Sequence, residues 1–158
     1  MPSIISMNTE ITKQLTISGA SRARGKITSA QNISSGVWTL IHLNAEVYDN
    51  LGDFNTSTWL FTTPTTGYYL VTANFRLTIG GAFSIGMYVG KNGSTPGPPH
   101  AMLPAGTTGQ QSHATSSEVL SLTAGDTLGL YGYQNSGVAT AVKINTLIEN
   151  YLTVHRLS

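Results

Sequence analysis

The sequence contains no cysteine and little charge: only 9% of its 158 residues are Asp, Glu, Lys or Arg. Soluble domains usually carry about a quarter of charged residues. The lack of cysteine excludes disulfides and thiolate metal sites, so stability must come from packing and assembly. Ser, Thr, Asn, Gly and Tyr replace the charged residues. This composition favours exposed β-sheet and extensive contact between subunits over helix.

Long hydrophobic runs are also missing. No stretch approaches the roughly 20 apolar residues of a membrane span. The first residues show no basic region followed by an apolar core, and Glu10 interrupts them early, so we expect no signal peptide. The net charge is +1, which provides no strong field toward nucleic acid or an anionic membrane. We therefore expect neither of these partners.

The N-terminal segment differs from the rest in charge. Residues 1–26 hold four basic side chains against Glu10 alone, a balance of 4 − 1 = +3. We predict an arm over residues 1–25 that either pairs as a strand or is ordered by a partner, followed by one domain over residues 26–158. Its basic side chains are the candidates for anchoring the arm to an acidic protein partner. They are Lys13, Arg22, Arg24 and Lys26.

Apolar and polar side chains alternate from Lys26 onward, with the period of two that half-buried antiparallel strands show. Between Tyr69 and Ile79 the odd positions are apolar and most even positions are polar. Residues 83–90 and 142–154 alternate in the same way. No segment has a helical period. We predict an all-β domain of about ten short strands, folded as a two-sheet antiparallel sandwich.

Turn-forming residues separate these strands. Gly80-Gly81, Gly125-Asp126 and the run 135–137 each reverse the chain between two strand patterns. Residues 94–115 differ because they carry four prolines, which central strands do not tolerate. This segment is predicted to be a long surface loop or an irregular sheet edge.

Two corners of the chain carry a more specific pattern. Residues 61–69 contain Phe, two residues, Pro, and then Gly-x-Tyr, and residues 119–126 run Val-Leu-Ser-Leu into a Gly-Asp turn. Together they resemble the jelly roll shared by complement globular heads and the tumour necrosis factor superfamily, over residues 26–157. The resemblance implies a jelly-roll sandwich that trimerises through one sheet. It also implies a non-enzymatic binding or structural role.

The signature residues themselves are expected to be structural. The proline and glycines set turns, the aromatic rings fill the core, and the aspartate bonds its own turn backbone. The signature residues are Phe61, Pro64, Gly67, Tyr69, Gly125 and Asp126.

No catalytic constellation is present in the sequence. The four histidines share no metal-ligand spacing, and the serines near His113 have no placed acid. Asp49 and Asp53 are separated by a short loop and can bind a cation such as calcium only with help from backbone carbonyls. A solvated acidic turn is the simpler interpretation of this pair. We expect no enzymatic activity, no metal and no other cofactor.

The tyrosines admit two interpretations. Tyr68, Tyr131, Tyr133 and Tyr151 can form a face that stacks on sugars, or a contact between subunits. Strand parity turns Leu147 and Tyr151 away from the core, and an exposed Leu beside a Tyr favours a buried interface. We therefore predict that Leu147, Tyr151, Tyr131 and Tyr133 contribute to the trimer interface.

The polar segments Gln31–Thr39 and Tyr131–Gly137 resemble bacteriophage virion proteins in style. We predict a trimeric capsid decoration or cement protein, assembled in the host cytoplasm and carried on the virion surface. It would contact the major capsid or tail protein through its arm and stabilise the shell by mass action. One alternative is the receptor-binding tip of a tail or head fibre, recognising a host surface glycan or protein. Another is a secreted lectin-like or cytokine-like ligand.

Overall fold

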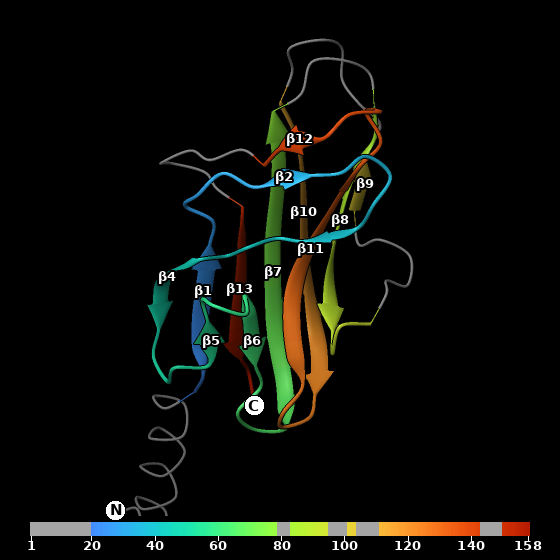
Figure 1. Cartoon of the computed structure of the whole chain (residues 1–158). Coiled ribbons are helices and arrows are strands. Elements are labelled where there is room, and N and C mark those ends of the chain that lie inside the picture. The colour runs from blue at the N-terminus through green and yellow to red at the C-terminus, as the bar shows by residue number, and fades with distance from the viewer. Residues whose placement is uncertain (1–19, 79–82, 95–100, 104–110, 143–149) are drawn as a thin grey trace, which may run out of the picture.

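A computed structural model of the chain describes residues 20–78, 83–94, 101–103, 111–142 and 150–158. Throughout these ranges the regular structure is β-strand, and no helix long and apolar enough to span a membrane occurs in them (Figure 1). The strands are β1 (Arg22–Lys26), β2 (Asn32–Ile33), β3 (Thr39–Leu40), β4 (Ala45–Asp49), β5 (Phe54–Asn55), β6 (Leu60–Thr62), β7 (Gly67–Thr78), β8 (Ile85–Lys91), β9 (Ala101–Leu103), β10 (Gln111–Leu122), β11 (Thr127–Gln134), β12 (Thr140–Ala141) and β13 (Tyr151–Arg156).

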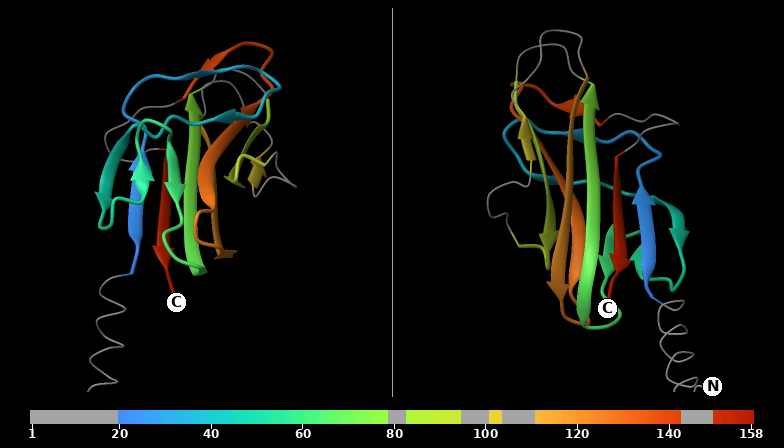
Figure 2. Two further views of the ribbon diagram at one scale, coloured as in Figure 1. Left: turned by 60° about the horizontal axis from the view of Figure 1, so that its bottom comes forward. Right: turned by 180° about the vertical axis from the view of Figure 1, so that it is seen from behind.

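Two antiparallel sheets form a sandwich. The five-stranded sheet has the order β10-β7-β13-β1-β4. The six-stranded sheet has the order β5-β6-β11-β8-β9, with β3 paired to β11. The short pair β12-β2 lies at one end of the sandwich (Figures 1 and 2). This arrangement confirms the all-β jelly roll predicted from the sequence.

The predicted alternation places the core between the sheets. Along β7 the side chains from Tyr69 to Leu77 at odd positions are all buried, and those on β11 at Leu128 and Leu130 face them. The Phe61 ring is fully buried and meets the ring of Tyr69 edge-on, with 6.2 Å between ring centroids. Burying side chains of this size contributes about 1.5–3 kcal/mol each.

The two signature corners bond to each other. The backbone N–H of Thr63 donates to the carbonyl of Asp126 at 2.8 Å, and the N–H of Gly125 donates back to the carbonyl of Thr63 at 2.8 Å. The Asp126 carboxylate accepts the N–H of Thr123 at 2.7 Å, within its own turn. Gly125 has φ of +90°, a conformation that favours glycine. The pattern is therefore the joint between the β6–β7 and β10–β11 turns.

The basic end of the predicted arm is part of the sheet. Residues Arg22–Lys26 form β1, which pairs with β13 on one side and β4 on the other. Pairing as a strand is one of the two alternatives predicted for the arm, and β1 begins three residues before the predicted boundary at residue 25. Lys13 lies outside the described residues.

The proline-rich segment is partly regular. β9 forms an edge of the six-stranded sheet, and the first residues of β10 also fall within the segment 94–115. The described parts of the segment are therefore strand, as an irregular sheet edge predicts. Residues 95–100 and 104–110 lie outside the described ranges.

Candidate functional site

The outer face of the five-stranded sheet is basic. Arg22 and Arg24 on β1 and Arg76 on β7 alternate with the core positions of their strands. The Arg24 guanidinium lies over the Tyr151 ring, 4.1 Å from its centroid. Between these groups the face is lined by short hydroxyls, such as the pair Thr72 and Ser117, whose oxygens are 3.1 Å apart.

Two arginines on this face are incompletely paired. The Nε atoms of Arg24 and Arg76 are buried and have no hydrogen-bond partner among the described residues. A buried donor without a partner costs about 1–3 kcal/mol.

An open cleft lies where β1, β4 and β13 meet. Among the described residues its walls are Arg22, Tyr48, Asn50 and His155, and its volume is about 440 Å³. The Tyr48 hydroxyl and the His155 Nε2 share a hydrogen bond of 2.8 Å across it. Burial, with a smaller contribution from the nearby Arg22 charge, lowers the pKa of His155. The imidazole is therefore neutral at neutral pH.

β10 is a long and unprotected edge of the same sheet. Its twelve residues pair with β7 in continuous register, and no other strand of the described residues pairs with its far side. The strand contains no Lys, Arg or Pro, the residues that usually block an edge from pairing with another chain. Val119 on this strand is 54% exposed and lies beside Leu70 in the register.

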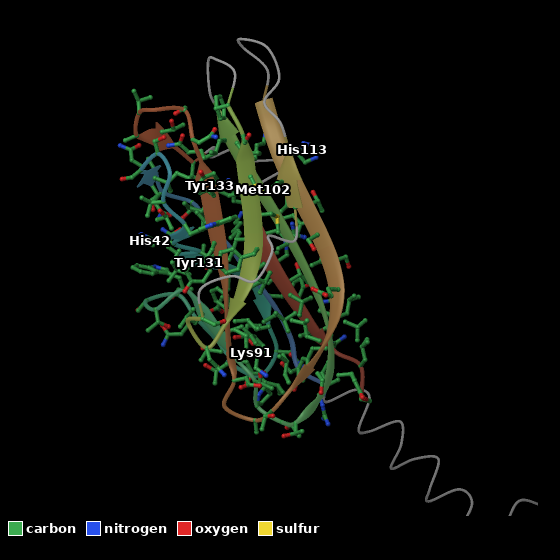
Figure 3. The ribbon with its side chains drawn as sticks, turned by 90° about the vertical axis from the view of Figure 1, so that its right-hand side faces the viewer. His42, Lys91, Met102, His113, Tyr131 and Tyr133 are labelled. Atoms are coloured by element: carbon green, nitrogen blue, oxygen red, sulfur yellow. The ribbon has the colours of Figure 1, made fainter. Side chains whose placement is uncertain are left out.

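The outer face of the six-stranded sheet is aromatic. Tyr131 on β11 stacks on Tyr88 of β8, with ring centroids 4.7 Å apart and planes 8° from parallel. Trp38 meets Tyr88 edge-on at 4.9 Å and Tyr133 at 5.0 Å. We call these four residues the aromatic face, and Figure 3 shows Tyr131 and Tyr133 on it. Burial, together with the nearby Tyr131, raises the pKa of Tyr88 to about 12.

Glycines make room for these rings. A Cβ at Gly90 would lie 2.6 Å from the Tyr131 ring, and one at Gly86 would lie 2.9 Å from the Trp38 ring. Both distances are shorter than any real contact of a Cβ atom. Only glycine at these two positions therefore lets the rings lie directly against the strand backbone. Tyr88 forms the buried floor at 3% exposure, and the other three rings are half-buried above it.

A second aromatic pair lies near this face. The His42 ring stacks on Trp59, with centroids 3.5 Å apart and planes 15° from parallel. Trp59 has φ of +64°, which is uncommon for any residue but glycine and rarer for a bulky one. Burial lowers the pKa of His42.

The structure separates the predicted interface tyrosines. Tyr151 lies on the outer face of the five-stranded sheet, whereas Tyr131 and Tyr133 belong to the six-stranded sheet. One sheet face cannot contain all three. Leu147 lies outside the described residues. Tyr68, on β7, is 56% exposed and belongs to the five-stranded sheet.

The acidic pair is occupied by its own surroundings. The Asp49 carboxylate accepts the backbone N–H groups of Leu51, Gly52 and Phe54. Asp53 accepts the Ser21 hydroxyl at 2.6 Å. Burial raises the pKa of Asp53, an effect that the Ser21 hydrogen bond opposes. Within the described part of the chain, no group of three or more His, Asp or Glu side chains could hold a metal ion.

Trp38 and Tyr88 escaped prediction from the sequence. Trp38 precedes the short β3 and follows no strand period, and Tyr88 occupies a polar position of an alternating pattern. The available signal was the pair Gly86 and Gly90, which flank Tyr88 on the same face of β8 and leave room for large rings beside it.

Comparison with known proteins shows the fold. A scan of protein families finds no matching model, and no curated protein matches the sequence. Solved structures do match. Murine APRIL at pH 5.0 aligns with a TM-score of 0.64 and 14% identity over 87% of this chain and 99% of that chain. The Eiger TNF of S. frugiperda aligns with a TM-score of 0.57 and 12% identity over 88% and 92%. The chain therefore has a jelly-roll fold of the tumour necrosis factor type.

Proposed function

We propose that the protein is a non-enzymatic, homotrimeric recognition module that binds a partner on a cell surface. The observation that carries the proposal is the unprotected edge of β10 beside a basic sheet face. A strand of this length leaves an edge of roughly 40 Å at about 3.4 Å per residue. Exposed strands of this kind are covered in native assemblies.

A three-fold ring supplies that cover. In a ring the contacts are heterologous, so one patch of a subunit meets a different patch of its neighbour. The β10 edge with Val119 would pack against the outer face of the next five-stranded sheet. Acceptors from the neighbour would then satisfy the Nε atoms of Arg24 and Arg76, which lack partners in the described chain. The tumour necrosis factor type of fold supports this mode of assembly.

The recognition role is assigned to the sheet face that the trimer contact leaves exposed. Trimerisation through the five-stranded sheet keeps the aromatic face of the six-stranded sheet exposed. A cytokine-like or fibre-tip ligand needs such an outward surface. The capsid-decoration role needs an anchoring arm, but Arg22, Arg24 and Lys26 are held in β1 between two strands. We therefore favour the recognition role over the capsid-decoration role, and a virion-surface location remains a prediction.

The mass of the full-length protein in solution tests the assembly. The wild type should be a trimer at micromolar concentration. Val119→Lys should give a monomer, because a Lys on the edge places a charge in the contact. Val138→Lys is the matched control, because Val138 is 65% exposed and lies outside β10. A monomeric wild type would overturn the trimer, and so would a trimeric Val119→Lys variant.

A further inference from the structure

The two sheets differ sharply in charge. Lys91 is the only charged residue in the described strands of the six-stranded sheet, and its Nζ lies 2.6 Å from the Asp126 carboxylate. Lys91 lies at the far end of β8 from Gly86, which pairs with Met102 (Figure 3). The charged side chains of the other strands all belong to the five-stranded sheet. The aromatic face is therefore electrically neutral.

Neutral hydrogen-bonding groups surround one end of the aromatic face. The loop before Trp38 and the turn after Tyr133 are tied together, since Gly36 N–H donates to the Gln134 carbonyl at 2.7 Å and Gly137 N–H donates to the Ser35 hydroxyl at 2.8 Å. The polar residues of this rim are Ser34, Ser35, Asn135 and Ser136.

We propose that the aromatic face binds a neutral saccharide, with Trp38, Tyr131 and Tyr133 stacking on sugar rings and the rim bonding to their hydroxyls. A pyranose presents C–H groups of small positive charge on its flat face, and an aromatic ring presents a negative face. Its edge carries hydroxyls that need neutral donors and acceptors. The proposal rests on the recognition role above and names its ligand class, but it does not depend on the trimer.

The geometry favours a stacking platform over a cage. Tyr88 is covered by its neighbours, whereas Trp38, Tyr131 and Tyr133 stay half-buried, so these four described rings form a surface and do not surround a cation-sized space. Because Gly86 and Gly90 carry no side chains, the rings lie close to the strand backbone and form a broad, shallow surface. Anionic ligands such as nucleic acids, phosphopeptides or acidic glycans need unpaired cations, which the described strands of this sheet lack. The same neutrality separates the surface from the basic face assigned to self-association.

The first experiment is a binding screen of the full-length protein against immobilised oligosaccharides. The panel holds neutral glucans, mannans, galactans and chitin fragments, with sialylated and sulfated glycans as charged counterparts. The strongest ligand is then titrated by calorimetry and by tryptophan fluorescence. Trp38→Phe assigns the fluorescence change, since the chain has two tryptophans. We expect saturable binding of a neutral saccharide, with a spectral change that Trp38→Phe removes.

Variants at three tyrosines locate the site. Tyr131→Ala and Tyr133→Ala should each weaken binding about tenfold or more, as the loss of a stacked ring at an interface does. Tyr68→Ala should leave the affinity within about twofold, because Tyr68 is exposed on the opposite sheet. Circular dichroism and the thermal midpoint confirm that each variant is folded, and Tyr131→Phe provides a milder change at the same position.

Several results would overturn the proposal. They are no saturation by any neutral saccharide at millimolar concentration, a preference for charged glycans, and unchanged affinity in Tyr133→Ala. Dissociation of the trimer in Tyr131→Ala or Tyr133→Ala would instead make the aromatic face a contact between copies. A monomeric wild type that binds the saccharide through these tyrosines would support the site, although it would contradict the proposed trimer.

Discussion

The Tyr48 hydroxyl lies 2.8 Å from Nε2 of His155 and connects β4 to β13 across the intervening strand β1. The bond joins residues more than a hundred positions apart in the sequence. It lies beside Arg22, in the cleft on the basic face. A proton on His155 would therefore be placed in a partly buried position next to a positive charge.

We predict that stability falls as the solution becomes mildly acidic. The pKa of His155 is lowered from 6.5, first by burial and then by Arg22, and burial lowers the pKa of His42 as well. The unfolded chain then binds protons that the folded chain resists, so the free energy of unfolding decreases as pH falls from about 6.5 through the folded pKa values. Urea unfolding between pH 7.5 and 5 measures this slope.

The variant His155→Asn should reduce that slope. An equal slope in wild type and in a variant that lacks both His42 and His155 would contradict the assignment.

A second pH effect belongs to the corner of β8, β10 and β11. Hydrogen bonds from Lys91, Asn92 and the Thr123 backbone lower the pKa of Asp126 to about 2. A carboxyl with a depressed pKa stabilises the fold at pH values above its unfolded pKa, and that contribution disappears as pH falls from about 4 to about 2. Asp126→Asn should lower the free energy of unfolding at pH 6. Below pH 4 that free energy should decrease less steeply with falling pH than in the wild type. If the pH dependence below pH 4 is the same in the variant and the wild type, the Asp126 carboxylate does not stabilise the fold in this way.

Gly132 is predicted to be the least replaceable glycine of β11. A Cβ at this position would overlap the ring of Phe75, which is fully buried on the facing sheet. Gly132→Ala should destabilise by about 1–3 kcal/mol through overpacking. Because Phe75→Leu removes the obstructing ring, the double variant should lose less stability than the sum of the single changes. Additive losses in denaturant unfolding would show that the two positions do not touch.

Trp59 offers a test of backbone strain against ring stacking. Its φ of +64° strains any residue with a Cβ, and its ring stacks on His42. Trp59→Ala loses the stack and keeps the strain, whereas Trp59→Gly loses the stack and relaxes the backbone. We expect Trp59→Gly to be more stable than Trp59→Ala by about 1 kcal/mol, measured by thermal unfolding. An alanine variant of equal or greater stability would show that the strain is negligible.

Local pattern predicted much of this fold. The alternation of residues 69–77 places the odd side chains in the core, because successive side chains on a strand point to opposite faces. Pro64 and Gly125 likewise predicted the turns, since proline restricts and glycine permits backbone angles locally. The chain itself therefore determined which residues form strands and which faces of them are buried.

Only the tertiary structure decided which exposed faces lie together. Tyr131 and Tyr151 occupy equivalent half-buried positions of alternating strands, yet strand order puts them on opposite sheets. Trp38 joins Tyr88 and Tyr133 from a loop that has no period. Strand periodicity depends on neighbours two residues apart, whereas pairing depends on hydrogen bonds between segments separated by tens of residues. For this reason the sequence determined a half-buried tyrosine at each position, and topology decided whether it faces the basic or the neutral side of the molecule.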